Sequence, residues 1–205
     1  MKYICVVGQK GVGKDTFAAL LVNELASHGV ISKTEALATP VKDALINLFD
    51  ADPDIFYDPM QKEVPQAVLY GVTPRKAMQT FGTDWCQSLF SKNIWLDHLV
   101  HRTEKQTEYD VIIVTDVRFK HELDFFRNLG SQVIFIDRKV TCFDGSQKAF
   151  GKIVQSFFQK DTHISEKGLG EFRRPEDAFV KNDDGLHHLL EKAKAYSKGY
   201  IVHHL

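Results

Sequence analysis

The segment that decides the fold is residues 8–16, which read GQKGVGKDT and follow the apolar run YICVV at residues 3–7. A strand, a glycine-rich turn and a helix are expected in that order, and the turn fits the pattern G-x-x-x-x-G-K of a loop that binds polyphosphates. Its glycines let backbone amides approach an anion without interference from a Cβ atom. Lys14 adds a positive charge, and the helix that begins near Asp15 directs its positive dipole end at the same anion. The glycines in question are Gly8, Gly11 and Gly13.

Asp15 departs from this pattern, because Ser or Thr is expected directly after Lys14. Two interpretations stay open. The carboxylate either accepts a hydroxyl proton, orders the waters of a magnesium ion or touches an acceptor substrate, or it is a first-turn acid that complements the helix dipole. Thr16 supplies a hydroxyl, one residue away from the usual position.

The composition indicates a single domain with room for an inserted lid, since the chain has 205 residues, of which 43% are hydrophobic. The net charge of −1 gives no general attraction to nucleic acid or to an anionic membrane. Three cysteines lie far apart without a CxxC pair, so we expect free thiols in a reducing cytoplasm and no zinc site. No apolar stretch is long enough to span a bilayer. The cysteines are Cys5, Cys86 and Cys142.

Apolar periodicity predicts alternating strands and helices around the loop. The expected elements are a helix over 14–28 ended by Gly29, a strand over 34–37, a helix with Thr39 as N-cap and Val41, Leu45 and Leu48 buried, a loop over 50–58, several short helices over 63–103 including one that starts at Thr73, strands over 111–116 and 133–136 with a helix over 119–129 between them, and a last helix over 186–196 capped by Asn182 or Asp183. This order implies a parallel sheet with crossover helices.

Gly8, Asp116 and Arg138 each follow a predicted strand, so we expect them at the carboxyl edge of the sheet, where ligands bind. Asp116 has the form of a carboxylate that holds Mg²⁺ directly or through water; the alternative is that it caps the helix after it. Arg118 and Arg138 at this edge are candidate cations for a transferring phosphoryl group. Lys76, Arg173 and Arg174 are interpreted as surface charges.

Two features near the C-terminal half have simpler interpretations. His163 and Glu166 share a helix face, but without further ligands nearby a hydrogen-bonded pair is favoured over a metal site. A helix over 146–159 carries an aromatic stripe that is interpreted as core, with a subunit interface in a homodimer as the alternative.

Several segments together are similar to the phage-type deoxynucleoside monophosphate kinases, P-loop kinases that pass the γ-phosphate of ATP to a deoxynucleoside monophosphate (dNMP). The resemblance covers nearly the whole chain. The segments are GQKGVGKDT at 8–16, ATPVK at 38–42, the stretch from Thr73 to Asp84, TDVRF at 115–119 with Glu122, DTHISE at 161–166 and NDDG at 182–185.

The resemblance implies a role for each matching residue. ATP would be held by Gly11, Val12, Gly13, Lys14, Asp15, Thr16 and Asn182. The acceptor would meet Asp15, Lys42, Arg75, Gln79, Thr83, Asp84, Trp85, Asp116, Arg118, Phe119 and Glu122. Lys14, Asp15, Arg118 and Arg138 would carry catalysis, and Asp15, Thr16 and Asp116 would hold Mg²⁺, directly or through water.

The resemblance also implies a P-loop kinase fold, with a central parallel sheet, helices on both faces, a helical segment for the monophosphate at about 38–103 and a lid at about 138–177. The core would comprise about 1–37, 104–137 and 178–205. ATP and a dNMP would be the partners, with Mg²⁺ as cofactor, in the host cytoplasm if the chain is phage-encoded. The family usually has an arginine where this chain has Gln87, which shifts the grip on the acceptor phosphate to Arg75 or Arg102.

Two alternatives remain at this point. A kinase resembling dephospho-coenzyme A kinase shares the loop, the strand before Asp116 and the NDDG segment. The second alternative is a nucleotide-binding protein without catalytic activity. The presence of Lys14, Asp116 and Arg118 argues against it.

Overall fold

The computed structural model describes residues 1–138 and 169–204, and it divides the chain into two compact units. One unit comprises Met1–Thr34 with Glu108–Leu205, and the other comprises Glu35–Thr107. Outside the described residues lie most of the expected lid, the helix expected over 146–159, and Cys142, His163 and Glu166. The assignment of segments to a monophosphate-binding part and a lid stays a prediction.

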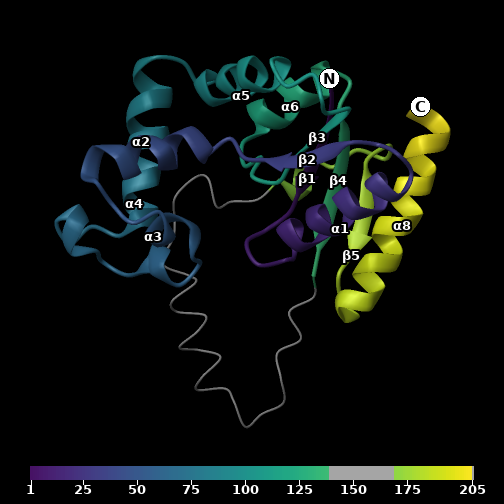
Figure 1. The fold of residues 1–205 in the computed structure, drawn as a ribbon, viewed down its shortest axis with the longest axis horizontal. Coiled ribbons are helices and arrows are strands. Elements are labelled where there is room, and N and C mark those ends of the chain that lie inside the picture. The colour runs from purple at the N-terminus through teal and green to yellow at the C-terminus, as the bar shows by residue number, and fades with distance from the viewer. Residues whose placement is uncertain (139–168, 205) are drawn as a thin grey trace, which may run out of the picture. The chain divides into compact units, whose positions relative to one another are not determined.

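The first unit is built on a five-stranded sheet with the order β2-β3-β1-β4-β5 (Figure 1). β1 pairs in parallel with β3 and β4, and β4 pairs in parallel with β5, so the predicted parallel sheet is confirmed. The second strand begins two residues earlier than the pattern predicts. The strands are β1 (Lys2–Val7), β2 (Ser32–Glu35), β3 (Val111–Val114), β4 (Gln132–Asp137) and β5 (Ala178–Lys181).

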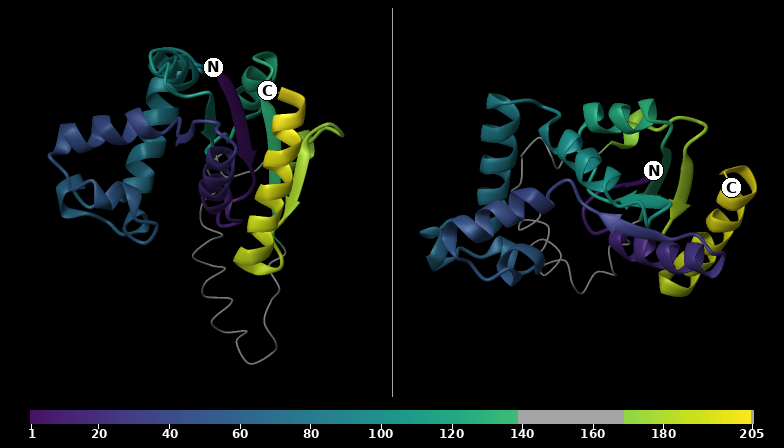
Figure 2. Two further views of the ribbon diagram at one scale, coloured as in Figure 1. Left: turned by 45° about the vertical axis from the view of Figure 1, so that its right-hand side comes forward. Right: turned by 45° about the horizontal axis from the view of Figure 1, so that its top comes forward.

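Helices cover both faces of this sheet, as predicted. α1 (Lys14–Ser27) and α8 (Gly185–His204) lie side by side on one face, where their apolar side chains join those of β1 and β4 in one core (Figure 2). α6 (Lys120–Asn128) covers the other face, and its Phe126 ring lies 5.6 Å from the Tyr3 ring of β1. α8 extends well past the predicted end near residue 196, because Tyr200 is buried in the same core.

The second unit is helical and has a separate small core. Its elements are α2 (Thr39–Phe49), α3 (Asp54–Tyr57), the 3₁₀ turns η1 (Gln61–Glu63) and η2 (Ala67–Leu69), α4 (Pro74–Gln79), the π-helix η3 (Thr80–Gln87) and α5 (Ile94–Glu104). Val41 and Leu45 of α2 pack with Ile55, Phe56 and Leu69.

Three expectations about this unit are wrong in detail. Thr39 is the first residue of α2, and Ala38 is its N-cap. Leu48 is 69% exposed, because the core reaches only the side of α2 that carries Val41 and Leu45. Residues 50–58 contain the short helix α3 instead of a loop throughout. The predicted start of α4 is confirmed, since Thr73 Oγ1 accepts from the Lys76 N–H at 3.2 Å.

Candidate functional site

The glycine-rich loop follows β1 directly, and structural constraints require glycine at three of its positions. A Cβ atom on Gly8 would lie 2.3 Å from the Ile136 carbonyl oxygen, so Gly8 allows the loop to pass close to β4. Gly11 (φ 80°) and Gly13 (φ 98°) adopt left-handed conformations that other residues avoid. The loop therefore has a fixed backbone shape and lies against the sheet, and α1 begins at Lys14.

Lys14 bends back over the loop from the first turn of α1. Its ammonium donates to the Gly8 and Gln9 carbonyl oxygens, both at 2.8 Å. These contacts hold the charge at the carboxyl end of β1, which is where the pattern predicts a phosphate. Asp15 and Thr16 follow in the same turn and are exposed, so both interpretations of Asp15 stay open.

Asn182 holds the same loop from the end of β5. Its side-chain amide is buried and donates to the Val12 carbonyl oxygen at 2.8 Å, and its backbone N–H donates to the Asp137 carbonyl oxygen at 2.8 Å. A Cβ atom on Gly13 would lie 2.6 Å from the Asn182 amide nitrogen. The alternative that Asn182 caps the last helix is wrong, because this side chain is directed at the loop and α8 begins only at Gly185.

The segment after β3 brings Asp116 and Arg118 to the same edge of the sheet as the loop, since β1 and β3 are parallel. Asp116 is half-buried and Arg118 is exposed. Phe119 is the N-cap of α6, so the alternative that Asp116 caps this helix is wrong.

Glu122 shapes this segment from inside the protein. It is 4% exposed, and its Oε2 accepts the backbone N–H of Arg118 at 2.7 Å and of Phe119 at 3.0 Å. Burial raises the pKa of this carboxyl to about 7, assisted by the negative charge of Asp116, while the two amides act in the opposite direction. Its observed partners are backbone groups, so a direct contact with substrate stays a prediction.

Arg138 directly follows β4 and is exposed, which places it at the predicted edge. Its N–H donates to Asp137 Oδ1 at 2.9 Å. The parallel sheet thus brings the loop, Asp116, Arg118, Arg138 and Asn182 to one edge of one unit.

A pocket of about 350 Å³ opens at this edge, beside the start of the loop. Arg173, interpreted from the sequence as a surface charge, lies on its wall with the guanidinium 4.3 Å from the Phe179 ring. The sequence did not predict this contact, because Arg173 lies before the strand that carries Phe179 and no pattern connects the two residues. The pocket is lined by Gly8, Gln9, Phe135, Ile136, Asp137, Leu169, Gly170, Arg173 and Phe179.

A buried ion pair that the sequence did not indicate fixes the segment before β5. Arg127 of α6 donates to Asp177 at 2.5 Å, and both side chains are at most 9% exposed. The same arginine donates to the Phe172 carbonyl oxygen at 3.0 Å, and Asp177 also accepts the Arg174 N–H at 2.6 Å. The partners are 50 residues apart, so only the fold reveals them.

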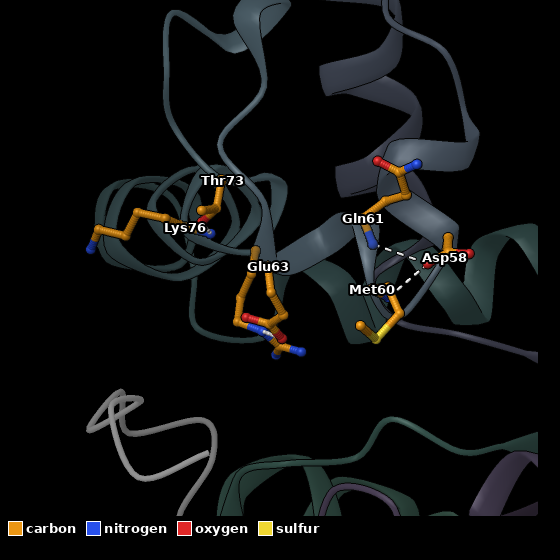
Figure 3. A network of polar contacts seen from close by, with 7 residues as sticks. Asp58, Met60, Gln61, Glu63, Thr73 and Lys76 are labelled. Atoms are coloured by element: carbon orange, nitrogen blue, oxygen red, sulfur yellow. Dashed lines mark hydrogen bonds and ion pairs between the residues drawn. The ribbon is translucent and has the colours of Figure 1, made fainter. Parts of the chain in front are cut away.

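In the second unit, Arg75 is held by a carboxylate. Its side chain is 12% exposed, and its Nε donates to Glu63 Oε1 at 2.7 Å. Glu63 ends the turn η1, which Asp58 braces by accepting the N–H of Met60 at 2.6 Å and of Gln61 at 3.0 Å (Figure 3). The guanidinium is therefore oriented by a turn 12 residues earlier.

The other predicted acceptor residues of this unit lie on three helical segments, α4, η3 and α2. Gln79 ends α4, and Thr83, Asp84 and Trp85 belong to η3. Lys42 lies on α2, which packs against α4, with its ammonium 3.9 Å from the centre of the Tyr57 ring. Gln87 ends η3, and Arg102 of α5 donates to Glu35 at 2.7 Å and to the Ala36 carbonyl oxygen at 3.2 Å. The second unit thus gathers most of the residues predicted for the acceptor.

The carboxylates of the first unit fit a magnesium ion better than a metal that takes a full set of protein ligands. Within residues 1–138 and 169–204, the structure contains no group of three His, Cys, Asp or Glu side chains able to hold a metal. Mg²⁺ is commonly held by one or two carboxylates with waters and substrate phosphates. Asp116 and Asp15 offer such carboxylates. Among the described helices, none is long and apolar enough to cross a membrane.

A family model and individual sequences both relate this chain to deoxynucleotide monophosphate kinases. The family of deoxynucleotide monophosphate kinases matches residues 62–193. A protein of Acanthamoeba polyphaga mimivirus, provisionally named as a deoxynucleotide monophosphate kinase, is 33% identical over 193 residues, which are 89% of each chain. The deoxynucleotide monophosphate kinase of Enterobacteria phage T4 is 34% identical over 122 residues, which are 58% of this chain and 43% of the phage protein.

Solved structures resemble the chain only distantly. A gluconokinase from Sinorhizobium meliloti aligns with a TM-score of 0.46 and 12% identity, over 100% of this chain and 98% of that one. The APS kinase of Mycobacterium tuberculosis aligns with the same TM-score and identity, over 98% and 95%. The relationship to known proteins is therefore established by sequence.

Proposed function

The chain belongs to the deoxynucleotide monophosphate kinase family, and from this premise we propose how its residues transfer the γ-phosphate of ATP to a dNMP. An oxygen of the acceptor monophosphate forms a bond to the γ-phosphorus. The bond between that phosphorus and the β,γ-bridging oxygen breaks, and ADP and dNDP are the products. The observation that carries the proposal is the position of Lys14, Asp116 and Arg118 at one edge of the parallel sheet.

The loop is the donor site in this proposal. The backbone amides of residues 11–13 surround the β- and γ-phosphates, with Lys14 as a point charge on their oxygens. Asn182 keeps the loop in shape through its bond to Val12. A loop that is already rigid loses little free energy when the nucleotide binds, because its conformation is set in advance.

Asp116, Asp15 and Thr16 are the residues proposed to hold Mg²⁺, directly or through its waters. The ion neutralises charge on the β- and γ-phosphates when it is bound. Asp116 follows a buried strand and is half-buried itself. Asp15 is exposed on the first turn of α1, where it is available to a ligand of the loop.

The acceptor site is proposed to use both the second unit and the segment after β3. Arg75, oriented by Glu63, and Gln79 would bind the 5′-phosphate, with Lys42 as a further cation. Thr83, Asp84 and Trp85 would contact the sugar and base. Phe119 and Glu122 would complete the wall that Asp116 and Arg118 begin, with Glu122 acting through the backbone amides it accepts.

Catalysis in this scheme is positioning and charge stabilisation. Transfer requires the reacting atoms to be about 3–3.5 Å apart and aligned, and little covalent chemistry is left for the protein. Arg118 and Arg138 would stabilise the charge on the equatorial oxygens of the moving phosphoryl group. Exclusion of water by a closing lid would prevent hydrolysis of ATP. A cytoplasmic location and a homodimer stay predictions.

A coupled assay of ADP release tests the proposal. The acceptors are the four dNMPs, dUMP, the four ribonucleoside monophosphates and dephospho-coenzyme A, each with ATP and Mg²⁺. We expect ADP release that depends on one or more dNMPs. Release with dephospho-coenzyme A alone would identify the other kinase class, and nucleotide binding without release would identify a non-catalytic protein.

A further inference from the structure

One helix of the second unit changes type along its length. α4 is an α-helix up to Gln79, and the chain continues without a break into the π-helix η3. The backbone stays helical at both junctions, with φ −64° and ψ −48° at Gln79 and φ −75° and ψ −36° at Ser88. π-Helices are rare and occur mostly at functional sites. This π-helix contains Thr83, Asp84 and Trp85, three of the residues proposed to contact the acceptor.

Two neighbouring helices, α2 and α5, both contact η3 at Gly82. A Cβ atom on Gly82 would lie 3.2 and 3.3 Å from the two methyl carbons of Val41, so α2 packs directly against the η3 backbone there. On α5, the indole N–H of Trp95 donates to the Gly82 carbonyl oxygen at 3.0 Å. Trp95 is partly buried against the same small core. The indole bond therefore provides a specific tether for the π-turn.

The π-turn changes which side chains share a face. Arg75, Gln79 and Thr83 follow one another in steps of four residues. In an α-helix of 3.6 residues per turn, each such step overshoots a full turn by roughly 40°. A π-helix bonds residue i to i+5 and takes more residues per turn. Each residue of a π-helix therefore turns through a smaller angle than in an α-helix, so the step from Gln79 to Thr83 offsets the overshoot from Arg75 to Gln79 and keeps Thr83 near the direction of Arg75.

We propose that Trp95 is a positioning residue for the acceptor site: by holding Gly82 it maintains the π-turn that keeps Thr83 on the side of the helix that carries Arg75 and Gln79. The inference rests on the proposed function, because the aligned residues are those assigned to the acceptor. The same turn places Trp85, which is 49% exposed and packs against Phe81 and Phe90 with ring centres 5.4 and 5.8 Å away. Relaxation of the turn would move the sugar- and base-facing side chains together.

The test compares Trp95→Phe with Thr103→Val. Trp95→Phe removes the donor and keeps an aromatic ring in the core. Thr103 lies on the same helix and is fully buried, and its hydroxyl donates to the Leu99 carbonyl oxygen at 2.9 Å. Thr103→Val therefore also removes a side-chain hydrogen bond to the backbone, but without touching η3. It is the matched control for loss of stability alone.

Two measurements are made on each full-length variant. Hydrogen exchange of the peptide covering 80–87 reports whether the turn is still held, and steady-state kinetics give the KM for the dNMP and for ATP. For Trp95→Phe we expect faster exchange at 80–87 and a dNMP KM raised about fivefold to tenfold, as for the loss of one hydrogen bond. Its KM for ATP should stay within about twofold. Thr103→Val should leave both KM values within the same margin.

The outcomes separate this inference from the proposed function. Unchanged exchange at 80–87 in Trp95→Phe would overturn the tether, and faster exchange with an unchanged dNMP KM would overturn the positioning role. Equal rises in both KM values, or the same changes in Thr103→Val, would show a general loss of stability and refute the proposal. A wild-type protein that releases no ADP with any dNMP would refute the proposed function instead, and the exchange data would still decide whether Trp95 holds the turn.

Discussion

The two units build their parts of the proposed site in opposite ways. In the first unit the donor loop is one run of nine residues, and its lysine bonds to carbonyl oxygens five and six residues away. In the second unit the candidate acceptor side chains are held by partners on other elements: Arg75 by Glu63, 12 residues away, and the backbone at Gly82 by Trp95, 13 residues away. The donor half is thus mainly a local backbone shape that Asn182 braces from the end of β5, whereas the acceptor half depends on how helices pack.

This difference predicts what mutation does to each half. A single change in the loop should abolish phosphoryl transfer without affecting the fold of the rest. Single substitutions among the acceptor helices should each reduce activity less, because several contacts together bind the acceptor nucleotide.

Lys14→Ala should have the largest effect. Removal of one preorganised charge from a phosphoryl-transfer site costs about 10³-fold in kcat/KM. The melting temperature should stay close to that of wild type, because the hydrogen bonds from the lysine to Gly8 and Gln9 lie within its own loop. The exposed Lys192 of α8 provides a control, since Lys192→Ala removes an equal charge far along the chain. Unchanged transfer in Lys14→Ala would show that the loop is not the donor site.

Asp15→Asn should lower kcat by about 10²-fold if the carboxylate serves Mg²⁺ or the acceptor. The amide keeps the size of the side chain and loses the negative charge. The dependence of the rate on Mg²⁺ concentration and the two KM values would show which half of the site Asp15 serves. Full activity would favour the helix-dipole interpretation.

Glu122 should make the stability of the first unit depend on pH. Its pKa is about 7 in the folded protein and about 4.5 when exposed. The folded state therefore binds more protons than the unfolded state between these values, and the free energy of unfolding falls as pH rises from 4.5 to 7. Urea unfolding measured at pH 5 and at pH 7.5 tests this. Between the two pH values the free energy of unfolding of wild type should fall by about 2 kcal/mol more than that of Glu122→Gln.

Glu122→Gln is itself the control in this comparison, because the amide cannot titrate in the same range and its oxygen still accepts the backbone N–H groups. The same slope with pH in both proteins would mean that Glu122 is ionised in the folded state throughout, and that its burial is offset by the two amides.

Arg75→Ala should have the smallest effect of the four and act on the acceptor alone. We expect the dNMP KM to rise about tenfold and the ATP KM to stay within about twofold, as for the loss of one charged hydrogen bond. Lys76→Ala is the matched control, because Lys76 is the next residue of α4 and is exposed. Equal changes in both KM values of Arg75→Ala would reject its assignment to the acceptor.

Much of the first unit followed from the sequence, because local patterns set its parts. Continuous apolar runs at 3–7 and 111–114 predicted buried strands, and the order of strands and helices predicted parallel pairing. Parallel pairing in turn predicted one edge for Gly8, Asp116 and Arg138. The buried role of Glu122 did not follow, since a glutamate in the first turn of a helix is usually exposed and complements the dipole.

The acceptor helices were predicted as short helices without their internal order. A change from α-helix to π-helix leaves no apolar period that can be recognised over eight residues, and the partner of Gly82 lies on another helix. The exposure of Leu48 was also unpredictable from α2 alone, because an apolar stripe does not show how far the facing core extends.

The sequence by itself determined the donor loop, the parallel sheet and the family, because a motif of consecutive residues fixes its own backbone geometry and an apolar strand has to be buried. Only the tertiary structure decided that Asn182 braces the loop, that Glu122 holds the segment after β3 and that Trp95 tethers a π-turn. Each of these contacts is made by hydrogen bonds between a side chain and specific backbone groups. Those at Asn182 and Trp95 join separate elements, and the environment of all three exists only once the core has formed.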